Sequence, residues 1–202
     1  MSSVHVRLHK DILWLILDNP PLNPLTIEML DRLASALKGA MQYEPSLVVI
    51  TGMGEKAFSV SVDLPDDDTE KQRQELLRAA RGVSEALKAL HNQHISTVAL
   101  VKGAAFAAGV ELLSLCDTVI ARDDARFRLP SVIAKIFPTA LSTYLPQTIG
   151  QAHTTHLVQS GETLTAAEAF GIGLVHQVLP ARRFLPDSEE LLTMLAAVGA
   201  SF

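Results

Sequence analysis

A run of small residues between a strand and a helix constrains this fold more than any other part of the chain. Residues 97–101 predict a buried strand, and Gly and Ala fill most of positions 103–109 before an apolar helix. Small side chains let a ligand approach the main chain, and the first turn of a helix has N–H groups without helical partners. Glu111 lies in that predicted turn, where an oxyanion could be held beside it. Close packing of strand against helix would use the same residues, so both interpretations stay open.

Strands and helices alternate along the rest of the chain. Strands are predicted at residues 12–17, 47–51, 57–63, 97–101, 119–121 and 125–128. Helices are predicted from the Thr26 cap to Gly39, at residues 70–91, in the region after Thr139, at 166–170 behind a Thr165 cap, and at 188–198. This order is typical of right-handed βαβ units and predicts an α/β fold. The last helix starts so late that we expect it to dock on a partner subunit or to mark a shortened chain.

The composition narrows the possible environments and partners. The 202 residues are 48% hydrophobic and 19% charged, with a mean hydropathy of +0.24, so we expect apolar surface to be covered in a homo-oligomer. A net charge of −5 argues against nucleic-acid binding. The chain shows neither a targeting segment nor an apolar run long enough for a membrane span, which predicts a cytoplasmic protein without a membrane partner. The single Cys116 excludes an internal disulfide.

Several of these segments, in this order, resemble the crotonase superfamily, which includes enoyl-CoA hydratases and isomerases. The resemblance is carried by residues 17–26, 48–63, 101–117, 125–130, 145–150 and 160–175. It implies a crotonase-like spiral of ββα/βαβ units that assembles as a trimer or a dimer of trimers. It also implies an acyl-CoA or acyl-carrier thioester as substrate, no further cofactor, and a place in fatty acid metabolism. We therefore expect a spiral core at residues 1–180 and a short C-terminal helical segment at 181–202, truncated relative to the family.

The resemblance also assigns the residues that hold the thioester. Two main-chain N–H groups, carried over by position to Val62 and Ala108, are expected to form the oxyanion hole. The family usually has Ala and Gly there, and Ser61 stands where it often has Gly, so the loop here has fewer allowed main-chain conformations. The substrate-binding residues implied by the match are Ala57, Ser59, Ser61, Asp63 and Gly109.

The carboxylates decide which reaction is possible. In hydratases of the family two glutamates hold a water between them, and the first of these matches Glu111. The second position, after Pro130, is Ser131, whose hydroxyl can orient water but cannot exchange a proton near neutral pH. We assign both residues to the catalytic site and expect ordinary hydration to be impaired, whereas an isomerase, a thioester hydrolase or a decarboxylase can work with fewer acids.

Two further observations bear on function. Residues 64–68 include three consecutive aspartates where the family commonly has a base near the CoA phosphates; the run either disfavours phosphate or is a solvated loop before a helix. The histidine pairs at 91/94 and 153/156 have no carboxylate or cysteine at ligand spacing, so no metal site is expected. Two hypotheses follow: an acyl-CoA hydratase or isomerase with Glu111 as the proton-transfer residue, or a catalytically degenerate crotonase-fold subunit that binds a partner.

Overall fold

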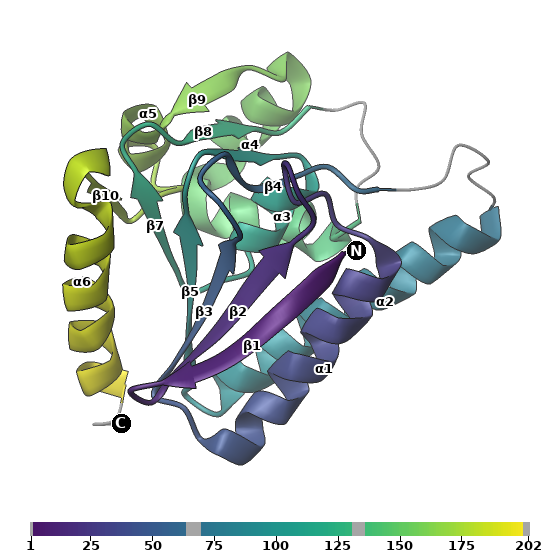
Figure 1. The fold of residues 1–202 in the computed structure, drawn as a ribbon. Helices are drawn as coiled ribbons and strands as arrows, with labels where there is room; N and C mark the ends of the chain where they lie inside the picture. Colours follow the sequence, from purple (N-terminus) through teal and green to yellow (C-terminus); the bar gives the residue numbers. More distant parts are fainter. Residues whose placement is uncertain (1, 64–69, 131–135, 200–202) are drawn as a thin grey trace.

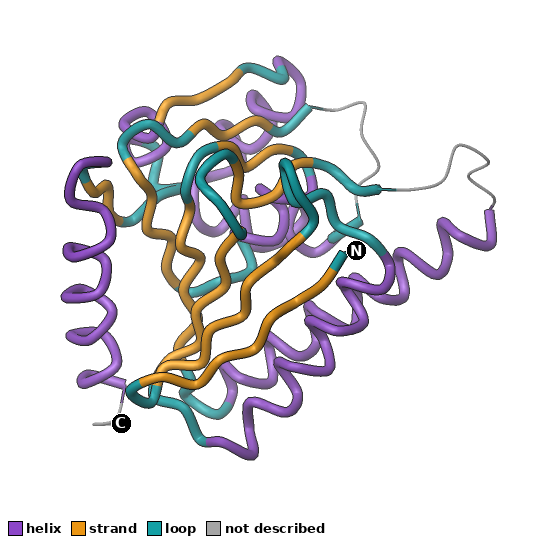
Figure 2. Tube along the Cα trace, in the orientation of Figure 1, coloured by secondary structure: helices purple, strands orange, loops and turns teal. Residues whose placement is uncertain are grey.

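The computed structural model describes residues 2–63, 70–130 and 136–199, whose strands form two sheets (Figures 1 and 2). The main sheet has the order β1-β2-β3-β5-β7-β10. Its strands are β1 Ser3–His9, β2 Ile12–Asp18, β3 Leu47–Gly52, β5 Ser96–Val101, β7 Thr118–Arg122 and β10 Gln177–Leu179. Only β1 pairs antiparallel within this sheet, across a tight turn at Lys10 and Asp11; the other neighbours are parallel. The parallel strands therefore end at one common edge.

A second, four-stranded sheet lies beyond that edge in the order β4-β6-β8-β9. It consists of β4 Ala57–Val60, β6 Ala104–Phe106, β8 Arg126–Arg128 and β9 Thr163–Thr165. Two long strands of the main sheet, β3 and β5, each run into a short strand of this sheet, and a helix follows. β3, β4 and α2 (Glu70–Asn92) form one turn, and β5, β6 and α3 (Ala108–Leu113) form the next. This repeated unit confirms the predicted α/β spiral of ββα units.

Helices α1 and α2 cover one face of the main sheet, and α6 covers the other (Figure 1). Their bounds are α1 Ile27–Tyr43, α2 Glu70–Asn92, α3 Ala108–Leu113, the π-helical turn η1 Ala140–Tyr144, α4 Leu145–Ser160, α5 Ala166–Gly171, the 3-10 turn η2 Ala181–Arg183 and α6 Phe184–Gly199. Both predicted caps are confirmed: Thr26 accepts a hydrogen bond from Met29 N, and Thr165 forms a capping box with Glu168. The predicted end of α1 at Gly39 was wrong, because the helix continues to a left-handed C-cap at Glu44.

Two apolar clusters hold the layers together. The larger one packs α1, α2 and α3 on the inner face of the main sheet, and its members include Leu15, Ile50 and Val101. The smaller one packs the outer face of the same sheet against α6, through Phe184 and Leu192. The late helix thus docks on the sheet of its own chain, which the expectation of a partner or a shortened chain did not foresee. The division into residues 1–180 and 181–202 stays a prediction.

Four strands were missed by the sequence prediction. These are β1, β6, β9 and β10, and three of them have only three residues, too few to show alternation of apolar and polar side chains. Cys116 is a free thiol and is buried, and this burial, followed by the nearby Asp117 charge, raises its pKa. Among the described helices, none combines the length and the apolar character that a membrane span needs.

Candidate active site

The candidate site lies where β4 and β6 end side by side. These strands are parallel, with Val60 opposite Phe106, and the Ser61 N–H donates to the Phe106 carbonyl at 3.2 Å. The chain then continues from β4 to Val62 and from β6 to Ala108, so each residue lies two positions beyond the paired Val60 and Phe106. The two predicted oxyanion residues are therefore brought to the same edge of the small sheet.

A parallel bridge to Leu25 sets the direction of the Val62 amide. Leu25 N–H donates to the Ser61 carbonyl at 3.2 Å, and Asp63 N–H donates to the Leu25 carbonyl at 2.9 Å. Because Leu25 bonds only to the residues that flank Val62, the Val62 N–H points to the opposite side of the strand. Ser61 reaches this arrangement with a φ of 63°, in the left-handed region that glycine adopts without cost.

A second unusual main-chain conformation precedes Ala108. Ala107 has φ 49° and ψ −114°, and its N–H donates to the Arg128 carbonyl at 2.8 Å. Ala108 is the first residue of α3, so its N–H has no partner within the helix. Within the described residues, neither the Val62 nor the Ala108 N–H donates to a main-chain carbonyl. Each main-chain turn thus presents one N–H at the site.

Glu111 lies one turn into α3 and is 2% exposed. Its Oε2 accepts a 2.8 Å hydrogen bond from the Phe137 main-chain N–H, which lies on the segment before η1. A buried carboxylate needs such donors, because burial without them would penalise its charge. The predicted catalytic Ser131 and residues 64–68, with the aspartates, lie outside the described residues.

The predicted substrate-binding residues differ in their surroundings. Ala57 and Ser59 are fully buried, whereas Ser61 is half-buried and Asp63 is exposed. A Cβ at Gly109 would lie 2.1 Å from the Ser59 carbonyl oxygen, so Gly109 allows α3 to contact β4. The structure thereby gives Gly109 a packing role, one of the two interpretations left open for the small residues. Contact of these five residues with substrate stays a prediction.

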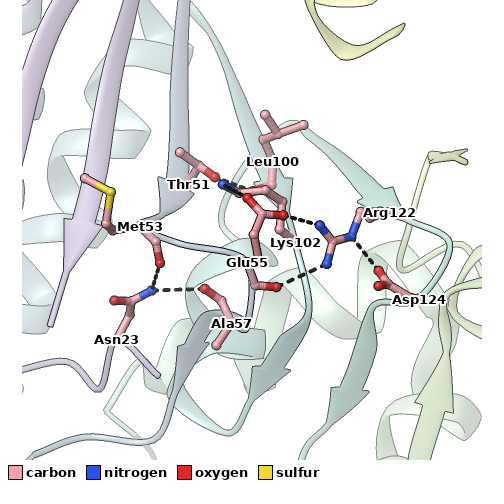
Figure 3. Close-up of polar contacts among 9 residues, drawn as sticks. All are labelled: Asn23, Thr51, Met53, Glu55, Ala57, Leu100, Lys102, Arg122 and Asp124. Atoms are coloured by element: carbon pink, nitrogen blue, oxygen red, sulfur yellow. Dashed lines mark hydrogen bonds and ion pairs between the residues drawn. The ribbon is translucent and has the colours of Figure 1, made fainter. Parts of the chain in front are cut away.

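Asn23 supports the site and was not singled out from the sequence. It is 1% exposed, and its Nδ2 donates to the carbonyls of Met53 and Ala57, both at 3.0 Å (Figure 3). These bonds tie the turn after β2 to both ends of the segment that joins β3 and β4. Its φ of 54° is one that asparagine tolerates better than most residues, and an asparagine directly before a proline is the signal that the sequence offers.

An ion-pair network, also missed, lies at the carboxyl edge of the main sheet (Figure 3). Glu55 pairs with Arg122 and, at 3.4 Å, with Lys102, while Arg122 also donates to Asp124 at 2.6 Å. Burial alone would raise the pKa of Glu55, but hydrogen bonds from Arg122 and Lys102 lower it below its usual value. The network fixes the β3–β4 loop to the ends of β5 and β7. Lys102 thus contacts a carboxylate.

The described residues gather no group of three or more His, Cys, Asp or Glu side chains that could hold a metal ion.

Comparison with known proteins places the chain in a family. The family model described as enoyl-CoA hydratase/isomerase matches residues 7–201. The chain belongs to this family. Among its relatives, the 2,3-dehydroadipyl-CoA hydratase of Escherichia coli K12 is 33% identical over 199 residues, which cover 97% of this chain and 76% of the relative.

Solved structures of similar proteins share the fold. DspI of Pseudomonas aeruginosa superposes with a TM-score of 0.85 at 25% sequence identity. The superposed region covers 98% of this chain and 74% of the DspI chain. An enoyl-CoA hydratase/isomerase family protein from Silicibacter pomeroyi superposes with a TM-score of 0.83 at 29% sequence identity. That match covers 96% of this chain and 84% of the Silicibacter protein. Membership in the crotonase superfamily and the crotonase-like α/β fold, both predicted from the sequence, are confirmed.

Proposed function

We propose that this member of the enoyl-CoA hydratase/isomerase family is an enzyme that stabilises an acyl-CoA thioester enolate. The Val62 and Ala108 N–H groups bind the thioester oxygen, and Glu111 carries the proton. The observation that supports this most is that both N–H groups lack a main-chain acceptor within the described residues, although they lie only two residues beyond paired strand ends. A packing role alone does not require two such groups at one edge.

The chemistry follows from where charge develops. Removing a proton next to the thioester carbonyl places negative charge on the carbonyl oxygen, and fixed N–H donors stabilise that charge without reorganising. Each donor of this kind contributes about 3–4 kcal/mol to transition-state stabilisation. Glu111 is buried one helical turn beyond Ala108, so its carboxylate is placed to take up the proton and to return it.

We further propose that the reaction needs one carboxylate rather than two. Ser131 occupies the position of the second glutamate, and a serine hydroxyl keeps its proton near neutral pH. A single carboxylate can move a proton from one carbon of the acyl chain to another, which shifts a double bond. Addition of water across the double bond needs a second proton-transfer group. A proton shift is therefore favoured over hydration as the reaction subtype.

Two absorbance assays separate these reactions. Crotonyl-CoA loses its conjugated absorbance on hydration, whereas a β,γ-unsaturated hexenoyl-CoA gains absorbance when its double bond moves into conjugation. We expect the second signal to appear and the first to be slow or absent. Rapid loss of crotonyl-CoA absorbance would contradict the single-carboxylate mechanism.

Calorimetric titration with acetyl-CoA tests the binding site in the same preparation. Glu111→Gln should lower turnover by about 10²-fold or more while acetyl-CoA still binds. Glu85→Gln, an exposed substitution on α2, is the matched control and should leave both unchanged. Binding without turnover of either substrate, unaltered by Glu111→Gln, would instead support the degenerate binding subunit.

We also propose that the chain forms a homo-oligomer of the trimer or dimer-of-trimers kind. The outer side of α6 supports this, because Leu185, Met194 and Val198 are each more than half exposed there. Sedimentation equilibrium of the purified protein gives the number of subunits. The cytoplasmic location, the role in fatty acid metabolism and the choice between CoA and a carrier protein as thioester handle stay predictions.

A further inference from the structure

A cavity of about 510 Å³ lies between α6 and the outer face of the main sheet. Its apolar walls come from three strands and from the helix, and include Ile12, Trp14, Ile16, Leu100, Phe184 and Leu192. Small-molecule sites typically have volumes of about 300–1,000 Å³, apolar linings and a few polar groups. The cavity has these properties.

The main sheet separates this cavity from the candidate active site. Leu100, Phe184 and Leu192 belong to the outer apolar cluster, whereas Ala108 and its neighbours on α3 belong to the inner one. A molecule in the cavity would therefore contact neither Glu111 nor the two N–H donors. The proposed catalysis does not use this cavity.

A lysine lies at each end of the cavity, and the two lysines differ in how far solvent reaches them. Strand register aligns Ile16 with Thr51 and Thr51 with Leu100, which places Lys102 just beyond the carboxyl ends of the strands. Lys10 lies at the other end, in the turn before β2, and pairs with Glu189. The Lys10 side chain is 61% exposed, whereas that of Lys102 is only 15% exposed. Lys102 is thus a largely desolvated cation at one end of an apolar slot, and water screens Lys10 more strongly.

We propose that this cavity binds a medium-chain fatty carboxylate. The alkyl chain lies between Trp14 and Leu192, and the carboxylate contacts the Lys102 ammonium group. An apolar cavity with a largely buried lysine at one end complements an alkyl chain that carries one anionic head group. The ends of parallel strands are also where ligands commonly bind in α/β sheets.

Glu55 competes with this ligand for Lys102. Its carboxylate is 67% exposed and lies 3.4 Å from the Lys102 ammonium group, a long contact that leaves other donors of the lysine available. Because Arg122 also binds Glu55 and is only 13% exposed, two largely desolvated cations share a carboxylate that water screens. Removing the charge of Glu55 should therefore strengthen binding, and removing that of Lys102 should weaken it.

Trp14 is the only tryptophan in the chain, so intrinsic fluorescence reports on the cavity directly. The experiment titrates the purified protein with sodium dodecanoate below its micelle concentration and follows Trp14 emission, with calorimetry in parallel. We expect a saturable change that acetyl-CoA does not displace. The change should persist in Glu111→Gln, so that loss of the proposed catalysis does not affect this result.

Three variants test the head-group contact. Lys102→Met should weaken dodecanoate binding about tenfold or more, Lys102→Arg should retain it, and Glu55→Gln should tighten it. Lys88→Met, on the exposed side of α2 across the sheet, is the matched control and should bind as the parent does. Dodecanol should bind the parent and Lys102→Met equally, because it has no charge to lose. Thermal unfolding of each variant confirms that it is folded.

Three results would overturn the proposal. The first is the absence of saturable binding by both fluorescence and calorimetry. The second is equal affinity of the parent and Lys102→Met for dodecanoate. The third is Trp14 emission that depends on protein concentration and not on dodecanoate, which would show that a second copy of the chain covers this face.

Discussion

The main-chain N–H of Phe137 donates a 2.8 Å hydrogen bond to Oε2 of Glu111. The two residues are 26 positions apart, and the bond ties the carboxylate on α3 to the segment that leads into η1. One oxygen of the carboxylate is thereby held by a main-chain group. The contact gives Glu111 a structural role as well as the proposed chemical one, and substitutions can separate the two.

Glu111→Ala should destabilise the fold more than Glu111→Gln does. Alanine leaves the buried Phe137 N–H without its acceptor, at a cost of about 1–3 kcal/mol, whereas glutamine retains a carbonyl oxygen. Unfolding in urea, followed by circular dichroism, measures both variants. Equal stability of the two would show that the hydrogen bond from Phe137 contributes nothing to the stability of the fold.

Ser61→Gly should stabilise the protein, which is unusual for a substitution by glycine. A φ of 63° costs a non-glycine residue about 1 kcal/mol, and glycine adopts it freely. The matched control is Ser35→Gly on the exposed side of α1, where the same change should cost roughly 0.5 kcal/mol. Denaturant midpoints of the two variants should therefore move in opposite directions. A loss of stability in both would mean that Ser61 makes a contact worth more than its strain.

The features predicted from the sequence are those that depend on local patterns. Thr26 and Thr165 cap their helices because a side-chain oxygen needs only a donor three residues ahead. The small residues before α3 marked where that helix starts, and so placed Glu111 in its first turn. The hydrogen bond from Phe137 to Glu111 and the Glu55 network join distant segments, and no local signal marks them. These depend on the tertiary structure.

The packing of α6 on its own sheet could not be predicted for the same reason. An apolar helix near the end of a sequence shows that it needs a partner surface, but not which one. The outer face of the sheet is formed by alternate residues of strands that also bury their other face, so the sequence shows continuous apolar runs rather than one exposed face. The docking of α6 on its own chain, and the cavity it leaves, followed only from the structure.

Gly109→Ala should destabilise the protein by about 2 kcal/mol, the range expected for overpacking. The added Cβ would lie 2.1 Å from the Ser59 carbonyl oxygen, which is main chain and cannot move without shifting β4. Gly39→Ala on α1 is the control, because nothing lies within 4 Å of its added Cβ and alanine favours a helix by about 1 kcal/mol. Thermal unfolding compares the two. An unchanged midpoint for Gly109→Ala would show that α3 and β4 can separate at low cost.

His176 should make folding stability depend on pH. Its Nδ1 accepts a 2.9 Å hydrogen bond from the Val119 N–H, next to the pairing of β7 with β10, so the ring must be neutral at that nitrogen. Partial burial lowers the pKa of His176 below its ordinary value of 6.5. Below that pH the unfolded chain therefore binds more protons than the folded one. The contribution of His176 is fully present above pH 6.5 and is lost as the pH falls toward the lowered folded pKa.

His176→Asn tests this contribution, since an asparagine carbonyl oxygen can accept the Val119 N–H without titrating. Urea midpoints measured from about pH 7.5 to about pH 5 should fall less steeply for the variant than for the parent. His153→Asn, an exposed histidine on α4, is the matched control and should keep the parent's slope. An equal slope in the parent and His176→Asn would show that protonation of His176 does not disturb the contact between β7 and the segment before β10.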